Sequence, residues 1–414
     1  MIMNSPFITF RCYSVKDNIK IKTFLLFSII SCTSIYIIYN FLPPVPVLKS
    51  VQQTKIQFKI VTTEISSILN NQRNVIDYET TYYNLTRLNV SSLSELVPEK
   101  EGHPLRVLIV STWRSGSSFL GEVLSTYPGN WYLFEPLGIY NDTRIRSGSY
   151  LEQPAVDLLR QTFLCNYTAY DEFTNKQWKN HVLNWTFERN RYMTNNCKKK
   201  LKHYCYEADA LSAMCKLFPL VSTKTVRLRL DVAENLLNDT KKLGPIKIIY
   251  LVRDPRGTIL SRKKFEHCNE SAECYETALL CADLMSEHLT SSRLIKKYPK
   301  QFSVLRYEDF SMKPIDEIKK LFDFLNLDLH YDIIKFINTH TNGVRKNIKQ
   351  SYAFSTYRNS TLTSLFWRQK STYEDVQSIQ NVCLPAMKLW GYLPAHNESH
   401  MRSFNPLTKY YLTF

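Results

Sequence analysis

The sequence predicts an α/β fold with a mostly parallel central sheet flanked by helices. Short apolar segments typical of strands alternate with segments typical of helices, which is the pattern of a parallel sheet. Two of the predicted strands, Leu105–Ser111 and Ile246–Val252, run directly into polar, basic turns that open a helix. Ligands of such sheets bind at the carboxyl ends of the strands, so both turns belong to one predicted site.

The N-terminal part of the chain predicts a membrane anchor. Residues 1–22 are basic, and Thr23–Leu42 follows with 20 residues and no charge. A helix of this length spans a bilayer, and its basic flank places residues 1–22 in the cytosol and the rest in the lumen. A cleaved signal peptide is the alternative, but the apolar run is longer than a typical signal segment and no small-residue cleavage site follows.

Glycosylation sequons and cysteines agree with a lumenal location for the rest of the chain. Nine N-x-S/T sequons follow the apolar segment, at Asn84, Asn89, Asn141, Asn166, Asn184, Asn238, Asn269, Asn359 and Asn397. Eight cysteines lie in the same part of the chain, at Cys165, Cys197, Cys205, Cys215, Cys268, Cys274, Cys281 and Cys383. An even number of cysteines in an oxidising compartment predicts disulfides, and their spacings do not match a zinc site.

Residues 43–103 are predicted to form a stem and residues 104–414 the compact domain. The domain's expected strands are Leu105–Ser111, Trp131–Glu135, a strand region in Leu220–Leu230, Ile246–Val252 and Phe302–Tyr307. Its expected helices are Ser117–Thr126, one beginning near Pro255, Cys274–Tyr298 and Ile315–Leu325, with an elaborated insertion over 141–215. The formal net charge of +16 suits acidic partners such as nucleotides and acidic glycans, whereas nucleic acid does not suit a lumenal domain.

The first turn, Thr112–Phe119, has the composition of an anion site. Gly116 permits a tight backbone and a close approach to a ligand, and Arg114 supplies a permanent charge with a planar fork of donors. Hydroxyl and N–H groups come from Ser115, Ser117 and Ser118. The turn lacks the lysine of a Walker A loop, which disfavours an ATPase or GTPase. The structural alternative is a helix start capped by Ser115.

The second turn, Val252–Arg262, places Arg253 at the end of a strand and Ser261 eight residues later. One turn and about one and a half helical turns separate the two side chains, so both can reach one phosphate. The structural alternative is an ion pair at the helix start, Asp254–Arg256 or Asp254–Arg262. Two such turns in one chain indicate a ligand with two separate phosphates.

Together the two turns resemble those of the membrane-bound carbohydrate sulfotransferases, in particular the galactose, N-acetylglucosamine and N-acetylgalactosamine 6-O-sulfotransferase group. The residues that match are Arg114-Ser115-Gly116-Ser117-Ser118-Phe119, Leu251–Arg256 and Ser261-Arg262. Further matches in the family's order are Phe134-Glu135-Pro136, Lys224 to Arg227, Arg306-Tyr307-Glu308-Asp309, Arg358-Asn359-Ser360, Trp367-Arg368, Cys383 and Gly391-Tyr392. The resemblance covers about 104–395 and implies a P-loop-like sulfotransferase fold in a Golgi membrane protein.

The resemblance also implies a reaction, in which a sulfuryl group moves from PAPS (3′-phosphoadenylyl sulfate) to a sugar hydroxyl without a metal. The 5′-phosphosulfate would be bound by Arg114, Ser115, Gly116, Ser117, Ser118 and Phe119, and the 3′-phosphate by Arg253 and Ser261. Arg114 would also stabilise the charge on the leaving phosphate.

Glu135 is the candidate general base, because it follows a short strand beside the first turn. Its alternative role is an ion pair with a neighbouring arginine. Lys224, Arg227 and Arg229 are candidates for contact with the cofactor or an anionic acceptor, and Arg306 and Glu308 are as consistent with a structural role.

Two other functions fit parts of the pattern. A Golgi type II glycosyltransferase shares the layout, but many of those enzymes need a D-x-D motif, and no two Asp residues here are separated by a single residue. A catalytically silent glycan-binding homologue is the other, and the intact Arg114, Ser118, Arg253 and Ser261 argue against it. The acceptor sugar and the oligomeric state, a homodimer included, stay open at this point.

Overall fold

The computed structural model describes residues 47–141, 143–170, 176–193, 206–265, 268, 270–341 and 363–409. The strands are β1 Leu105–Val110, β2 Asn130–Phe134, β3 Leu220–Thr225, β4 Ile246–Val252 and β5 Phe302–Arg306. The α-helices are α2 Val47–Glu79, α3 Leu85–Leu88, α4 Ser117–Thr126, α5 Glu152–Phe163, α7 Lys176–Phe187, α9 Ala208–Cys215, α10 Leu230–Asn238, α11 Thr240–Leu243, α12 Pro255–Arg262, α13 Ala272–Tyr275, α14 Thr277–Lys297, α15 Tyr307–Met312, α16 Pro314–Leu325, α17 Tyr331–Thr341, α19 Trp367–Lys370, α20 Tyr373–Leu389 and α21 Glu398–Ser403. A 3₁₀ helix, η3, covers Pro136–Tyr140.

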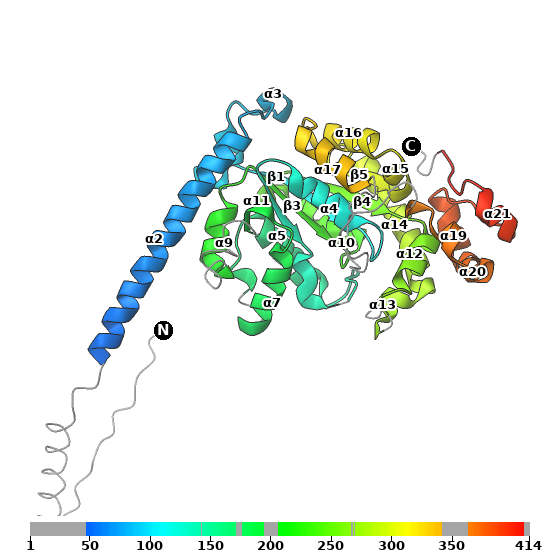
Figure 1. Ribbon diagram of the computed structural model, residues 1–414, viewed down its shortest axis with the longest axis horizontal. Helices are drawn as coiled ribbons and strands as arrows, with labels where there is room; N and C mark the ends of the chain where they lie inside the picture. The colour runs from blue at the N-terminus through cyan, green and yellow to red at the C-terminus, as the bar shows by residue number, and fades with distance from the viewer. Residues whose placement is uncertain are drawn as a thin grey trace, which may run out of the picture. The chain divides into compact units, whose positions relative to one another are not determined.

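A five-stranded sheet in the order β2-β3-β1-β4-β5 forms the centre of the fold (Figure 1). All four strand pairs are parallel, as predicted. β1 is the middle strand, with β3 on one side and β4 on the other, so Val110 pairs with both Thr225 and Tyr250. The segments that follow these three strands therefore leave the sheet at the same edge.

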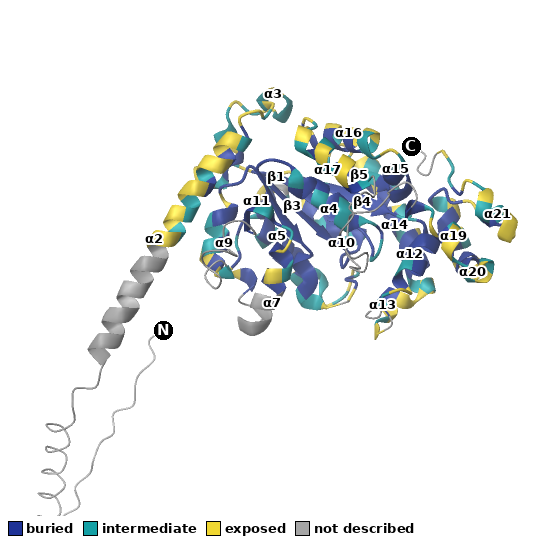
Figure 2. Ribbon diagram, in the orientation of Figure 1, coloured by how far each residue is buried: buried dark blue, intermediate teal, exposed yellow. Residues whose placement is uncertain are grey.

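Each face of the sheet packs against its own layer of helices, because successive strand residues point to opposite faces. Leu108 and Val110 of β1 belong to the core formed with α5, α10, α14 and α20. Val107 and Ile109 belong to a second core formed with α4, α15, α16 and α17. Burial on both faces explains why the strands are continuous apolar runs, and Figure 2 shows the sheet as the most deeply buried part of the structure.

Most predicted elements agree with the structure to within a few residues. The helix expected over Ser117–Thr126 and the strand expected over Ile246–Val252 have the predicted bounds. The predicted helix Cys274–Tyr298 is two helices, α13 and α14, separated at Glu276, whose side chain caps α14 by accepting from the Ala278 N–H. The insertion predicted over 141–215 contains α5, α7 and α9.

Three disulfides join the described cysteines, which confirms the prediction that this chain contains disulfides. The pairs are Cys165–Cys215, Cys268–Cys274 and Cys281–Cys383. Cys281–Cys383 joins α14 to α20 across 102 residues of sequence. Cys197 and Cys205 lie outside the described residues.

The compact unit that contains the sheet begins at Ile65, and Met1–Glu64 forms a separate unit. Part of the segment predicted as a stem is thus packed into the sheet-containing unit, where Ile76, Leu96 and Val97 are buried. The predicted anchor helix, 23–42, lies outside the described residues, and within the described ranges no helix meets the length and hydropathy needed to span a membrane.

Candidate active site

The two predicted anion turns lie side by side at the carboxyl edge of the sheet. The first turn follows β1 and the second follows β4, and these strands are hydrogen-bonded neighbours. A direct contact joins the turns, because Arg114 Nε donates to Ser261 Oγ at 3.1 Å. In the other direction, Arg253 Nη1 donates to the carbonyl oxygen of Arg114 at 2.6 Å. The structure therefore brings the predicted residues of both turns into one site.

The backbone of the first turn adopts two left-handed conformations. Arg114 has φ 67° and Gly116 has φ 92°. A non-glycine residue at positive φ is strained and is typical of functional sites. A Cβ atom added to Gly116 would lie 2.3 Å from Cε2 of Tyr307, so this position requires glycine for space as well as for conformation.

The serines of the first turn have different surroundings. Ser115 is 1% exposed, and its hydroxyl donates to the Thr112 carbonyl at 2.7 Å and lies 2.5 Å from the Ser111 hydroxyl. The residue that caps α4 is Gly116, with no side-chain cap bond, so the alternative in which Ser115 caps the helix is wrong. Ser117 and Ser118 form the first turn of α4, where N–H groups have no partner within the helix.

Phe119 directs its side chain into the core, and its N–H donates to the Gly116 carbonyl at 3.1 Å. Its ring stacks on Phe310 and Phe336, with centroid distances of 5.2 and 6.0 Å, on the α16 and α17 side of the sheet. The side chain therefore anchors the start of α4 in the core.

The second turn combines a structural ion pair with the two predicted phosphate ligands. Asp254 caps α12 by accepting from the Arg256 N–H, and the two side chains form a fully buried ion pair at 2.8 Å. The structural alternative for this turn is thus present in its Asp254–Arg256 form. Arg253 and Ser261 take no part in this ion pair and instead contact the first turn. The Arg253 guanidinium also lies 4.6 Å from the centroid of the Tyr307 ring.

Glu135 lies at the end of β2 in a buried cluster of opposite charges. Its carboxylate pairs with Lys224 Nζ at 2.6 Å and with Arg227 Nη1 at 2.7 Å, and it accepts from the Val226 N–H at 3.0 Å. Burial acts to raise the pKa of Glu135, but Lys224 and Arg227 outweigh it and leave the pKa below its usual value. Glu135 is therefore an ionised carboxylate that holds two cations.

Lys224 belongs to the same cluster and is equally buried. Burial lowers its pKa to about 8, although Glu135 acts in the opposite direction. Its ammonium group also lies 4.0 Å from the centroid of the Phe134 ring. Because β3 is the neighbour of β1, Lys224 lies one strand away from the start of the first turn.

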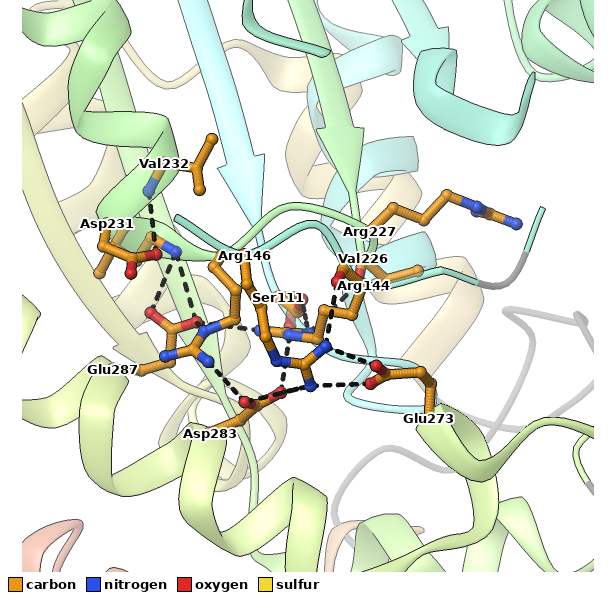
Figure 3. Close-up of polar contacts among 12 residues, drawn as sticks. Ser111, Arg144, Arg146, Val226, Arg227, Asp231, Val232, Glu273, Asp283 and Glu287 are labelled. Atoms are coloured by element: carbon orange, nitrogen blue, oxygen red, sulfur yellow. Dashed lines mark hydrogen bonds and ion pairs between the residues drawn. The ribbon is translucent and has the colours of Figure 1, made fainter. Parts of the chain in front are cut away.

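Arg229 belongs to a different ionic network, whose carboxylates Asp283 and Glu287 are labelled in Figure 3. It pairs with Glu287 at 2.6 Å and with Asp283 at 2.5 Å, both on α14. The prediction that Arg229 contacts a ligand is therefore not supported by the direction of its side chain. The same network contains Arg144, which sequence reasoning missed, because its carboxylate partners are about 140 residues away in the chain.

Arg306 and Glu308 have structural partners. Arg306 pairs with Asp309 at 2.8 Å and donates to the carbonyl of Thr408. Glu308 accepts from the Asp254 N–H and the Tyr392 hydroxyl, and burial raises its pKa to about 7. Arg358, Asn359 and Ser360, which belong to the resemblance, lie outside the described residues.

The donor atoms around the two turns suit anions rather than a metal. Guanidinium, hydroxyl and backbone N–H groups face one another there, whereas metal ions need carboxylate, imidazole or thiolate ligands. Within the described ranges, no group of three or more His, Cys, Asp or Glu residues could hold a metal ion.

The chain is similar to several known proteins. Carbohydrate sulfotransferase 4 of Mus musculus is 27% identical over 333 residues, covering 72% of this chain and 85% of that protein. Carbohydrate sulfotransferase 5 of Homo sapiens is 27% identical over 332 residues, covering 72% of this chain and 80% of that protein. A solved structure of mouse sulfotransferase SULT7A1 complexed with PAP has a TM-score of 0.36 and 15% identity, covering 69% of this chain and 85% of that one. The sulfotransferase domain family matches residues 104–391, which include both turns and the Glu135 cluster, and the chain therefore belongs to the sulfotransferase domain family.

Proposed function

We propose that this protein transfers a sulfuryl group from PAPS to a sugar hydroxyl on glycoprotein or proteoglycan glycans. The acceptor position proposed is the 6-hydroxyl of galactose, N-acetylglucosamine or N-acetylgalactosamine, by similarity to the carbohydrate sulfotransferases. The single observation that carries the proposal is the pair of cationic turns on neighbouring strands, joined by the Arg114–Ser261 contact. Such a pair matches a nucleotide that has one anionic group at each end of its ribose.

The first turn would bind the 5′-phosphosulfate and the second the 3′-phosphate. Arg114 and the N–H groups at the start of α4 would bind a common anion there, as at other helix N-termini. Arg253 and Ser261 would hold the 3′-phosphate. Ser261 already accepts a hydrogen bond from Arg114, so its hydroxyl hydrogen is available to a phosphate oxygen.

The reaction would be an in-line displacement at sulfur. The acceptor hydroxyl oxygen forms a bond to sulfur as the bond between sulfur and the bridging phosphate oxygen breaks, and PAP leaves with the electron pair. The hydroxyl proton passes to a base. Catalysis of this kind depends on positioning and on stabilising the charge that develops on the leaving oxygen, a role we assign to Arg114.

Glu135 is our candidate for the base that receives the proton, and the structure supplies a competing role. Its ion pairs with Lys224 and Arg227 lower its pKa, which weakens a base. In the competing role, the ionised carboxylate holds Lys224 and Arg227 beside the acceptor. A substitution that separates the two roles is described in the Discussion.

We also propose a Golgi location, with residues 1–22 in the cytosol, 23–42 in the membrane and the sulfotransferase domain in the lumen. The proposal rests on the uncharged segment, its basic flank and the nine sequons. The three disulfides are consistent with it, since disulfides persist in oxidising compartments.

The experiment that tests the function uses the full chain, purified in detergent, with radiolabelled PAPS and a panel of acceptors. The panel contains desulfated keratan, desulfated chondroitin and N-acetylglucosamine-terminated oligosaccharides. We expect label in one glycan, lost with Arg114→Ala and retained with Arg73→Ala, which removes a surface ion pair to Glu99. PAP binding without label in any glycan would favour a silent glycan-binding homologue. A folded chain that binds no PAP would contradict the proposal.

A further inference from the structure

The carbonyl groups at the start of the first turn are all occupied as acceptors. Four successive residues take part, and three of the four donors are guanidinium groups. The Ser111 carbonyl accepts from Arg144 Nη1 at 3.1 Å, Thr112 from Ser115 Oγ at 2.7 Å, Trp113 from Arg262 Nε at 3.0 Å and Arg114 from Arg253 Nη1 at 2.6 Å. The backbone conformation of this segment is thus set in large part by side chains from two other parts of the chain, the segment of Arg144 and the second turn.

This arrangement determines where the N–H groups of the turn point. In a trans peptide the C=O of one residue and the N–H of the next point in opposite directions. A guanidinium that holds the Ser111 carbonyl therefore directs the Thr112 N–H the other way, and one that holds the Trp113 carbonyl does the same for the Arg114 N–H. We propose that Arg144 and Arg262 are positioning residues, which orient the first turn for the 5′-phosphosulfate without contacting it. The inference rests on the proposed function, because it assigns the turn to that group.

Arg144 reaches two neighbouring strands at once. It lies in the segment between η3 and α5, and the same Nη1 that contacts the Ser111 carbonyl lies 3.2 Å from the carbonyl of Val226 (Figure 3). Two carboxylates of α14 hold its guanidinium from the other side, Glu287 at 3.0 Å from Nη2 and Asp283 at 3.0 Å from Nε. The side chain therefore has a fixed position between α14 and the carboxyl ends of β1 and β3.

The contact with Val226 extends the effect to the acceptor side of the site. The N–H of Val226 donates to Glu135, which pairs with Lys224. One guanidinium thus contacts the backbone that precedes the first turn and the backbone that holds the Glu135 cluster. Its position sets the spacing between the groups proposed for the cofactor and those proposed for the acceptor.

Arg262 holds the turn from the other direction. It ends α12, it is buried, and besides the Trp113 carbonyl it donates to the Cys274 carbonyl at 3.0 Å. Burial lowers its pKa to about 9, which still leaves the guanidinium charged at neutral pH. Arg262 therefore places a buried positive charge beside the first turn, which also favours an anion bound there.

Burying two arginines is unfavourable unless their donors are satisfied, and apolar residues of similar volume often stabilise a fold equally well. Here the two guanidinium groups donate to carbonyl groups at the proposed site, so the proposed positioning role accounts for the presence of two buried arginines.

Arg229 provides a matched control for Arg144. It pairs with the same two carboxylates, Glu287 and Asp283, and is also buried. Among the contacts of the described residues, its guanidinium reaches no carbonyl group of residues 111–114. Substituting lysine at either position disturbs the same ionic network, but only Arg144→Lys changes the first turn.

The test compares two ligands with the full chain, purified in detergent. PAP carries both phosphates, whereas adenosine 3′-phosphate carries only the one proposed for the second turn. We expect Arg144→Lys to weaken PAP binding about tenfold and to leave the affinity for adenosine 3′-phosphate unchanged, because the first turn is displaced and the second is not. Turnover should fall with it. Arg229→Lys should lower the melting temperature but keep the wild-type ratio of the two affinities.

Two outcomes would overturn the inference. One is an equal loss of both ligands in Arg144→Lys, and the other is the same affinity ratio in Arg144→Lys as in Arg229→Lys. If Arg144→Lys does not fold, Arg262→Lys tests the same statement, since its contact with the first turn does not involve the α14 carboxylates, and an unchanged ratio there contradicts it. A wild-type chain that binds no PAP would instead mean that the proposed function has failed.

Discussion

The Lys224–Glu135 ion pair makes the site sensitive to pH on the alkaline side. Lys224 has a pKa of about 8, so its ammonium charge is present at neutral pH and is lost as the pH rises past 8. We expect turnover to fall with a midpoint near pH 8, because the neutral amine no longer attracts the anionic cofactor or the charge that develops on transfer. The measurement is the dependence of kcat on pH with saturating PAPS.

Two variants give this profile its controls. Lys224→Arg keeps a cation with a much higher pKa, so the alkaline fall should move to higher pH. Glu135→Gln removes the group that raises the pKa of Lys224, so the fall should move to lower pH. A loss of 10²- to 10⁴-fold at every pH in Glu135→Gln would support the role of general base, about the size such a role supplies. A midpoint that no Lys224 variant changes would show that another group titrates.

At acidic pH the same ion pair is lost for a different reason, the protonation of Glu135. The pKa of Glu135 is lower in the folded protein than its usual 4.5, so its stabilising charge is fully present above about 4.5. The contribution is lost as the pH falls below that value and the carboxylate is protonated. Acid therefore weakens the edge of the sheet that holds the site.

At the scale of a single element, the first turn depends on a glycine that faces an aromatic ring. We expect Gly116→Ala to destabilise the protein by about 2 kcal/mol or more and to weaken PAP binding, because the new methyl group meets Tyr307 while the backbone keeps a positive φ. Urea unfolding and PAP binding measure the two effects.

Gly148 serves as a control that separates the backbone strain of a positive φ from the contact with Tyr307. It has φ 77°, but a Cβ atom there would meet nothing within 4 Å, so Gly148→Ala isolates the backbone strain at about 1 kcal/mol. Combining Gly116→Ala with Tyr307→Leu should recover the part of the loss that comes from contact with the ring. Equal losses for Gly116→Ala and Gly148→Ala would mean that the turn moves freely to accommodate the methyl group.

At the scale of the whole molecule, the disulfide Cys281–Cys383 closes a loop that spans a quarter of the chain. Replacing both cysteines with serine should cost about 4–5 kcal/mol of stability, because a loop of 102 residues loses much conformational entropy when it is closed. The same replacement at Cys268 and Cys274, six residues apart, should cost about half as much. Thermal unfolding of the two double variants checks the order, and an inverted order would show that native packing, rather than loop length, decides the contribution.

The fold was largely readable from the sequence because parallel strands buried on both faces are continuous apolar runs. β4 and α4 begin and end where the pattern predicts, since each has a clear boundary residue, Pro255 after the first and Gly116 before the second. The break between α13 and α14 was not predicted, because Glu276 acts as a cap only once the chain turns there.

The residues of the candidate site were likewise only partly predictable from the sequence. The site's candidate ligands lie in short contiguous motifs, so Arg114, Arg253 and Ser261 were predicted from these motifs and their resemblance to the sulfotransferases, and the structure brings them together. Arg144 has no local signal, because its partners are scattered among the strand ends and α14.

The sequence by itself determined the order of strands and helices along the chain, the two turns predicted to bind anions and the family to which the chain belongs. These properties depend on residues close to one another in the chain, where periodicity and capping act. The tertiary structure alone decided that Arg229 pairs with carboxylates of α14, that Glu135 is ion-paired, and that Arg144 and Arg262 hold carbonyl groups at the first turn. Those properties depend on which distant segments meet at one edge of the sheet, and only the packing of the helices against it determines that.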